Sequence, residues 1–302
     1  MRLITRSDFD GLACAVLLKE VGIVDERQFV HPKDIQDGLV KITDNDILAN
    51  VPFVEGCGLW FDHHFSEQER LDLKGRFKGD SRSAPSAARV IYDFYGGKEK
   101  FGHLEAMMEA VDKADSAQFT VEEVLKPQGW VLLAFVMDPR TGLGRFRDYK
   151  ISNYQLMDDL IEYCRSMTIE EILVLPDIQE RVVRYFAQNE LFTQMILKYS
   201  KTKDNAIITD LRNVETIYSG NRFLIYSLYP DQNISVWIID GKDKQNCVFA
   251  VGHSIINRTS QTNVGSLMLK YGGGGHKVVG TCQVPYEDTD RVLSELLLVI
   301  TT

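Results

Sequence analysis

Short apolar runs alternate with amphipathic segments over the first ~120 residues of the chain. Apolar runs bounded by polar residues predict strands, and apolar residues at helical spacing predict helices. The predicted strands are residues 3–5, 28–30, 46–51 and 58–61, and the predicted helices are residues 12–21, 83–94 and 104–114. Strand–helix alternation of this kind is typical of a parallel sheet covered on both faces.

The pattern changes twice farther along the chain. Residues 154–199 are nearly all helical in pattern, and only Pro176 interrupts them, so residues 177–199 are predicted to form one long helix. Strands are then predicted at 206–211, 223–229, 234–239, 247–251 and 281–284, and helices at 264–271 and 288–300. The fold class is therefore α/β: an N-terminal parallel-sheet domain (1–150), a helical linker (151–203) and a smaller α/β domain (204–302).

The length, net charge and cysteine content of the chain exclude some classes of function. The 302 residues suffice for two domains, and the formal net charge of -9 disfavours tight binding to long duplex nucleic acid, although it permits a small phosphorylated ligand. Five cysteines without a CxxC pair argue against a disulfide framework or a zinc–thiolate site. We find no signal-peptide pattern and no apolar stretch long enough to span a membrane, so a cytoplasmic protein is expected.

Two carboxylates follow the first predicted strand. Asp8 and Asp10 flank one residue, so their side chains would point to the same side of an extended segment. Carboxylates at the carboxyl end of a strand are suited to Mg²⁺ or Mn²⁺. The alternative is that Ser7, Asp8 or Asp10 caps the helix that follows.

A second polar cluster, Asp62-His63-His64, follows the predicted strand at 58–61. Imidazole nitrogen suits Mn, Fe, Co or Zn, and an adjacent carboxylate can ligate a metal or orient a ligating histidine. The alternative is a loop with two exposed histidines, and the segment alone does not decide between them.

Four consecutive glycines, Gly272 to Gly275, precede His276 and Lys277. One glycine would serve to end a helix, but four cost much backbone entropy. Exposed backbone N–H groups can hold an anion, and His276 adds a hydrogen-bonding side chain. The alternative, a flexible linker, is disfavoured because a strand pattern resumes at once.

Taken together, these motifs resemble the DHH/DHHA1 phosphoesterase family over nearly the whole chain. The Asp-x-Asp and Asp-His-His motifs resemble the DHH domain, and the Gly-Gly-Gly-Gly-His run resembles the signature of the DHHA1 domain. The segment at 114–120 resembles the family's later Asp motif, in which Asp115 is preferred to Asp112 because a small hydroxyl residue follows it. The order of motifs is closest to the exopolyphosphatase-like and small-oligonucleotide branches.

The resemblance implies a role for each motif. One or two Mn²⁺ or Mg²⁺ ions would be held by Asp8, Asp10, His63 and Asp115. The residues that would take part in catalysis are Asp8, Asp62, His64 and Arg6. The substrate would be bound by Arg258 (with Thr259), Gly272, Gly273, Gly274, Gly275 and His276. Two positions depart from the family pattern, because Arg6 and Asn50 stand where many members have His and Asp. We therefore predict one tightly bound ion, with the Arg6 guanidinium in the place of the other. The alternative is that Arg6 turns outward as a surface charge and that Asp8, Asp62 and solvent hold a second ion.

The predicted function is metal-dependent hydrolysis of a phosphodiester or phosphoanhydride in a small phosphorylated substrate. The substrate classes left open are short oligonucleotides, cyclic dinucleotides, nucleoside bisphosphates and polyphosphate. A catalytically weakened sensor of a phosphorylated small molecule is the alternative, and a nucleic-acid-binding module is disfavoured by the charge. The sequence does not decide between a monomer and a homodimer.

Overall fold

The computed structural model describes residues 1–64, 76–141 and 143–301, and these form two compact units. Unit 1 comprises residues 1–118 and 127–184, and unit 2 comprises residues 119–126 and 185–302. The long helix α11 (Pro176–Tyr199) contributes its first residues to unit 1 and the rest to unit 2. The functional roles assigned to segments 1–150, 151–203 and 204–302 stay predictions.

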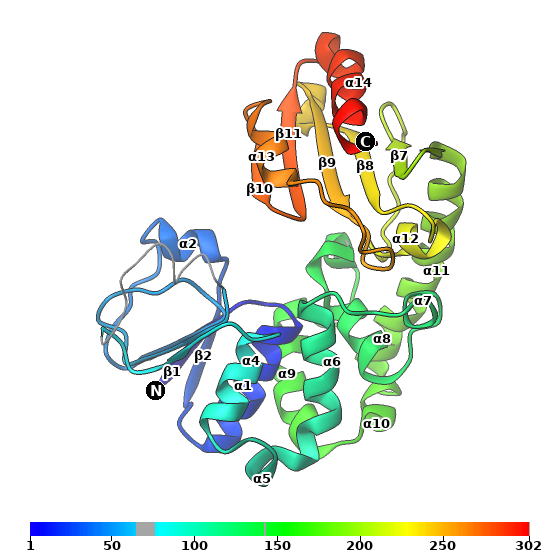
Figure 1. Cartoon of the computed structure of the whole chain (residues 1–302). Helices are drawn as coiled ribbons and strands as arrows, with labels where there is room; N and C mark the ends of the chain where they lie inside the picture. The colour runs from blue at the N-terminus through cyan, green and yellow to red at the C-terminus, as the bar shows by residue number, and fades with distance from the viewer. Residues whose placement is uncertain (65–75, 142, 302) are drawn as a thin grey trace. The chain divides into compact units, whose positions relative to one another are not determined.

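Unit 1 is built on a five-stranded parallel sheet in the order β2-β1-β3-β4-β5, as the strand–helix alternation predicts. Figure 1 labels β1 and β2 of this sheet. Its strands are β1 (Arg2–Thr5), β2 (Glu26–Phe29), β3 (Asp46–Ala49), β4 (Leu59–Asp62) and β5 (Gly79–Ser81). Its helices are α1 (Phe9–Val21), α2 (Pro32–Gln36), α4 (Ala87–Phe94), α5 (Gly97–Phe101), α6 (Glu105–Asp115), α8 (Gly129–Met137), α9 (Asn153–Ser166), α10 (Ile169–Leu173) and the start of α11, with 3-10 turns η1 (Gly102–Leu104), η2 (Pro139–Thr141) and η3 (Leu143–Arg145).

Both faces of the central strands β1, β3 and β4 are buried. Ile4, Leu48 and Trp60 lie side by side in the strand register and belong to one apolar cluster. Neighbouring residues point to the opposite face, where Phe61 packs edge-on against Phe94 of α4 at 5.2 Å between ring centroids. Helix α1 packs against β1, α4, α6 and α9, which explains why all its residues from 12 to 18 are buried.

Unit 2 is built on a six-stranded sheet in the order β10-β11-β9-β8-β7-β6, in which only β7 and β8 are parallel (Figure 1). Its strands are β6 (Ser200–Lys203), β7 (Ala206–Asp210), β8 (Ile234–Asp240), β9 (Cys247–His253), β10 (Gly274–His276) and β11 (Val279–Val284). Its other elements are α7 (Val121–Leu125), α12 (Leu224–Leu228), α13 (Val264–Leu269), α14 (Thr289–Ile300), η4 (Lys242–Lys244) and η5 (Tyr286–Asp288), besides the rest of α11.

Alternate side chains of β8 pack on opposite faces of the unit 2 sheet. Val236 and Ile238 enter an apolar core that α13 and α14 cover. Trp237, between them, stacks on Phe192 of α11 with 6.2 Å between ring centroids. The sheet is therefore packed on both faces, although its two edge strands, β6 and β10, were not predicted.

One predicted strand of unit 2 is a helix. Residues 224–228 form α12, which begins where the side-chain oxygen of Asn221 accepts the N–H of Phe223 at 3.0 Å. Residues 223–227 are all buried, and a short, mostly apolar run does not distinguish a buried strand from a buried helix. In unit 1, the helix predicted from residue 83 begins only at Ala87, because Ser86 is its N-cap.

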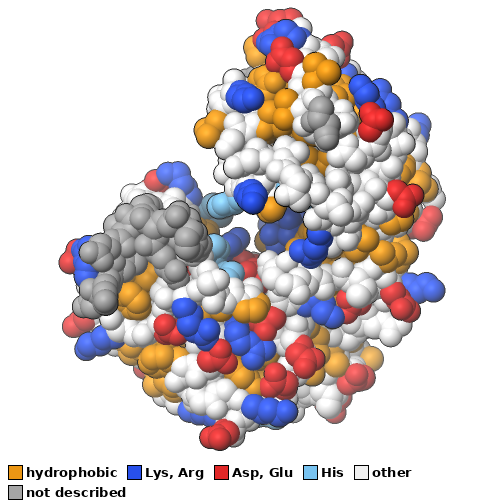
Figure 2. All heavy atoms as spheres, in the orientation of Figure 1, with side chains coloured by type: hydrophobic (Ala, Val, Ile, Leu, Met, Phe, Trp, Pro, Cys, Tyr) orange, Lys and Arg blue, Asp and Glu red, His pale blue; other side chains and the backbone are white. Residues whose placement is uncertain are grey.

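The surface of unit 1 carries charges of both signs. Figure 2 shows its Lys and Arg side chains interspersed with Asp and Glu side chains on the visible face, without a continuous basic stripe. Among the described residues, no helix has both the length and the apolar character needed to cross a membrane.

Candidate metal centre and substrate-binding residues

The parallel register of unit 1 brings the polar segments after β1, β3 and β4 to the same edge of the sheet. Asp8 and Asp10 follow β1, Asn50 follows β3, and His63 and His64 follow β4. This is the carboxyl edge of the strands, where ligands bind in open α/β sheets.

Asp10 lies in the first turn of α1 and is only 3% exposed. Its oxygens accept the backbone N–H groups of Ala88 (2.8 Å) and Ala87 (3.0 Å), which open helix α4. The positive end of the α4 dipole therefore fixes this carboxylate. Even so, burial and the neighbouring charge of Asp115 raise the pKa of Asp10 to about 7, so the protein does not fully neutralise this charge.

His63 faces two carboxylates. Its Nδ1 lies 3.1 Å from the carbonyl oxygen of Ala84, which can only accept, so Nδ1 carries the hydrogen. Its Nε2 lies 3.1 Å from Asp115 Oδ2 and 4.0 Å from Asp10 Oδ2. Burial alone would lower the pKa of His63, but its close contact with Asp115 and the charge of Asp10 outweigh burial and raise the pKa to about 9.

Asp10, His63 and Asp115 can each offer one ligand atom, and these atoms lie within 4.8 Å of one another. Two atoms on opposite sides of an ion bound at ~2.1 Å would be ~4.2 Å apart, so a small contraction would close the site on a metal. His63 Nε2 is buried without a hydrogen bond of good geometry to any described residue. An imidazole oriented by a backbone carbonyl beside one buried carboxylate, Asp10, and one partly exposed carboxylate, Asp115, fits a divalent ion.

Asp112, the other carboxylate considered as a metal ligand, forms hydrogen bonds with residues outside the cluster. It accepts Ser86 Oγ and Arg89 Nε, each at 2.7 Å. These bonds tie α6 to the start of α4, which carries the N–H groups that hold Asp10. The geometry therefore favours Asp115 as the ligand and gives Asp112 a supporting position.

Asp62 and His64 form a pair beside the cluster. His64 Nδ1 lies 2.8 Å from Asp62 Oδ1, and this bond helps to raise the pKa of His64. Asp62 is 1% exposed, whereas the His64 side chain is 42% exposed. The buried carboxylate thus orients a histidine whose side chain is partly exposed.

Asp8 is the N-cap of α1, as the capping alternative expected, and its Oδ1 accepts the N–H of Gly11 at 2.9 Å. The same oxygen accepts Asn50 Nδ2 at 3.2 Å, and Oδ2 lies 3.1 Å from Arg6 Nε. The helix begins at Phe9, so Asp8 and Asp10 do not lie in one extended segment, and they have different neighbours.

This chain resembles a solved protein along its entire length. PggH from Vibrio cholerae, described as a pGpG-specific phosphodiesterase, is 53% identical to it, with a TM-score of 0.90, and the match covers 99% of this chain and 98% of that one. The chain belongs to the DHH/DHHA1 phosphoesterase family.

More distant structures share the fold of this phosphoesterase. An exopolyphosphatase-related protein from Bacteroides fragilis is 10% identical with a TM-score of 0.52, and the match covers 98% of this chain and 91% of that one. An exonuclease RecJ bound to manganese is 13% identical with a TM-score of 0.51, over 98% and 89% of the two chains. No family model matches the sequence, and neither does any curated protein.

The glycine run of the phosphoesterase is part of its second sheet. Gly272 adopts a left-handed φ of 74° after α13, and Gly274 to His276 form the edge strand β10. A Cβ at Gly273 would lie 2.1 Å from the carbonyl oxygen of Thr281, and a Cβ at Gly275 would lie 2.3 Å from that of Val279. Close packing therefore explains much of the run, while His276 is exposed at the end of the strand.

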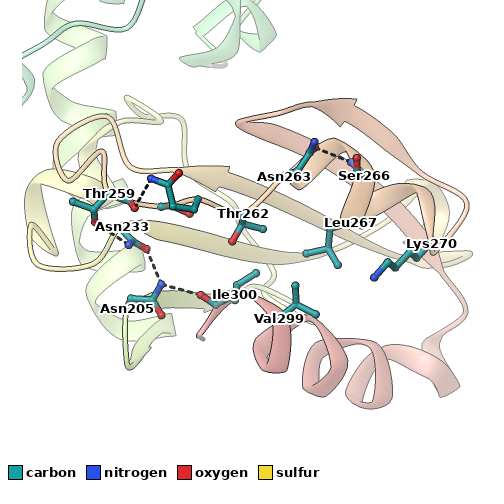
Figure 3. A pocket seen from close by; sticks show the side chains of 12 residues that line it. Asn205, Asn233, Thr259, Thr262, Asn263, Ser266, Leu267, Lys270, Val299 and Ile300 are labelled. Atoms are coloured by element: carbon teal, nitrogen blue, oxygen red, sulfur yellow. Dashed lines mark hydrogen bonds between the residues drawn. The ribbon is translucent and has the colours of Figure 1, made fainter.

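Arg258 and Thr259 lie in the loop between β9 and α13. Arg258 is exposed, and its Nε donates to the carbonyl oxygen of Ile255 at 3.0 Å. Thr259 lies on the wall of a pocket of about 480 Å³, where its hydroxyl accepts Asn233 Nδ2 at 3.0 Å (Figure 3). The pocket is lined by Asn205, Asn233, Thr259, Ser260, Gln261, Thr262, Asn263, Ser266, Leu267, Lys270, Val299 and Ile300.

Arg140 is a charged group near the metal centre that the sequence did not predict. It lies in the 3-10 turn η2, its Nε donates to Asp138 Oδ1 at 2.8 Å, and its charge acts on Asp8 and Asp115. No sequence pattern points to it, because the turn around Pro139 has no recognisable motif and lies far along the chain from β1 and β4.

Proposed function

We propose that this chain hydrolyses the phosphodiester bond of a linear dinucleotide of the pGpG kind, using one Mn²⁺ or Mg²⁺ ion held by Asp10, His63 and Asp115. The observation that carries the proposal is the 53% identity, over 99% of this chain, to a pGpG-specific phosphodiesterase. The cluster of two carboxylates and one oriented imidazole, in which Asp10 is buried, supports the choice of a divalent ion.

In this reaction, the elements of water add across the bond between phosphorus and the leaving 3′ oxygen, and two nucleoside 5′-monophosphates result. The ion, when bound, would lower the pKa of the attacking water and offset the charge of the phosphate oxygens. His64, oriented by Asp62, would donate its Nε2–H to the phosphate. Arg258, His276 and the Gly272–Gly275 backbone are proposed to bind the rest of the substrate.

Four substrates test the proposal: pGpG, a cyclic dinucleotide, a long RNA and polyphosphate, each with Mn²⁺ and with products separated by chromatography. We expect pGpG to be cleaved fastest and to yield two molecules of GMP. Binding of pGpG without any turnover would favour the alternative, a sensor of phosphorylated small molecules. Faster cleavage of long RNA or polyphosphate would refute the choice of a dinucleotide.

His63→Ala tests the metal assignment. The variant should lose bound Mn²⁺ and turnover, by more than the ~10–100-fold that follows the loss of a group that only orients a ligand. His103→Ala is the matched control, because His103 is half exposed in η1 and its nearest acidic oxygen, on Glu20, is 4.0 Å away. Normal metal content and activity in His63→Ala would remove this histidine from the centre.

A further inference from the structure

The carboxylate of Asp8 is occupied by donors of the chain itself. Three groups approach its two oxygens: the N–H of Gly11 and the amide of Asn50 on Oδ1, and the Arg6 guanidinium beside Oδ2. Asp8 and Asn50 are 8% and 1% exposed, so solvent does not compete for these contacts. A carboxylate held in this way has little capacity left to bind a metal ion.

Asn50 is fixed in its position. It follows β3 directly, its φ of 56° lies in the left-handed region that Asn tolerates better than most residues, and its N–H donates to the carbonyl oxygen of Phe61 at 3.1 Å. Its side-chain nitrogen therefore points at Asp8 as a neutral donor. A donor in this place repels a cation rather than ligating it.

The charges at this sheet edge balance one divalent ion. Asp10 and Asp115 together neutralise such an ion, and Asp8 is already paired with Arg6. Arg140 is paired with Asp138. A second divalent ion next to Asp8 would therefore add two positive charges beside a guanidinium. Asp62, a further carboxylate at this edge, would supply only one negative charge, and its Oδ1 already bonds His64 although its Oδ2 has no hydrogen-bond partner among the described residues.

We propose that this centre takes a single metal ion and that Arg6 acts as its second cationic group, binding a phosphate oxygen of the substrate. This inference rests on the proposed function. Among the described residues, Arg6 has no partner other than Asp8, and its side chain is 33% exposed. With Nε turned to Asp8, the terminal guanidinium nitrogens remain to donate to a phosphate, and the rigid fork suits that acceptor. Asn50 is a positioning residue that keeps Asp8 and Arg6 in place.

Metal stoichiometry is the first test and does not require turnover. Protein saturated with Mn²⁺ and then desalted should retain one ion per chain, as measured by elemental analysis, and calorimetric titration should show one tight site. Two tightly bound ions per chain would overturn the proposal. This result stands even if pGpG proves to be the wrong substrate.

Arg6→Gln is the second test, with GMP as the probe because it carries a phosphate and is not consumed. In the presence of Mn²⁺, the variant should keep one ion but bind GMP roughly ten- to a hundred-fold more weakly, the range expected for a lost hydrogen bond to a charged group. Arg2→Gln is the matched control, because Arg2 pairs with Asp46 at the opposite end of the same strand, and its GMP affinity should be unchanged.

Arg6→Lys covers the case in which the glutamine variant does not fold. It keeps the positive charge but loses the fork, so it should retain one ion and bind GMP with intermediate affinity. Unchanged GMP affinity in either Arg6 variant would overturn the phosphate-binding role. If the wild-type protein binds GMP but does not cleave pGpG, the proposed function fails while the role of Arg6 stands.

Discussion

Ser86→Ala should destabilise unit 1 and loosen the metal centre together. The Ser86 hydroxyl is fully buried, accepts the N–H of Arg89 at 3.0 Å as the N-cap of α4, and donates to Asp112 Oδ1 at 2.7 Å. The next two N–H groups of the same helix end hold Asp10. One hydroxyl therefore supports both the start of a helix and the position of a proposed ligand.

The expected loss of stability in Ser86→Ala follows from the two hydrogen bonds that the hydroxyl makes. Losing an N-cap costs ~1 kcal/mol of stability. Losing a hydrogen bond to a charged group costs ~1.5–3 kcal/mol. Because Arg89 still holds the other oxygen of Asp112, we expect a total of roughly 2.5–4 kcal/mol, with Mn²⁺ affinity reduced by up to ~10–100-fold.

Ser152→Ala provides the matched control. Ser152 caps α9 by accepting the N–H of Gln155 at 3.1 Å, but it is exposed and bonds no carboxylate. It should lose only ~1 kcal/mol and keep its metal affinity. Urea unfolding followed by tryptophan fluorescence, with calorimetric titration of Mn²⁺, measures both quantities. Equal losses of stability in the two variants, or unchanged Mn²⁺ affinity in Ser86→Ala, would refute the reasoning.

Two further predictions concern the glycine run and proton release. A Cβ at Gly273 would clash with the Thr281 carbonyl oxygen, whereas a Cβ at Gly274 would meet no atom within 4 Å. Gly273→Ala should therefore lower the unfolding temperature, and Gly274→Ala should leave it unchanged. Similar melting curves for the two variants would contradict this packing. Metal binding requires a neutral His63, whose pKa of about 9 means that it is protonated at neutral pH in the metal-free protein. Mn²⁺ affinity should therefore rise roughly tenfold from about pH 7 to about pH 8 in calorimetric titrations, and a flat profile would argue against His63 as a ligand.

Much of unit 1 could be predicted because its signals are local. The strands at β1, β3 and β4 are short apolar runs, and once they are placed in a parallel sheet, the polar residues after them must meet at one edge. Asp10 and His63 come together for this reason. The sequence does not contain the order of the strands, so the distances within the cluster come only from the structure.

The misplaced strand at α12 and the unpredicted Arg140 have a common physical cause. Residues 223–227 are buried by neighbours that are distant in sequence, and Tyr226 donates or accepts a bond at 2.8 Å with Ser235 of β8. The charge of Arg140 acts on Asp8 and Asp115 from a turn more than a hundred residues after β1. Neither environment leaves a periodic pattern in the local sequence, so tertiary packing decides both.

Asp8 and Asp10 show why residue spacing alone does not fix a metal site. The spacing places both side chains on one side only if the segment is extended, and a helix start between them separates their surroundings. Asp10, inside the helix, meets the N–H groups of α4 and the cluster with His63, whereas Asp8, before the helix, meets Arg6 and Asn50. The first turn of α1 thus gives two nearby carboxylates different electrostatic environments: Asp10 faces a histidine that becomes neutral when it binds a metal ion, and Asp8 is paired with a guanidinium that stays charged. This difference leads us to expect one metal ion rather than two.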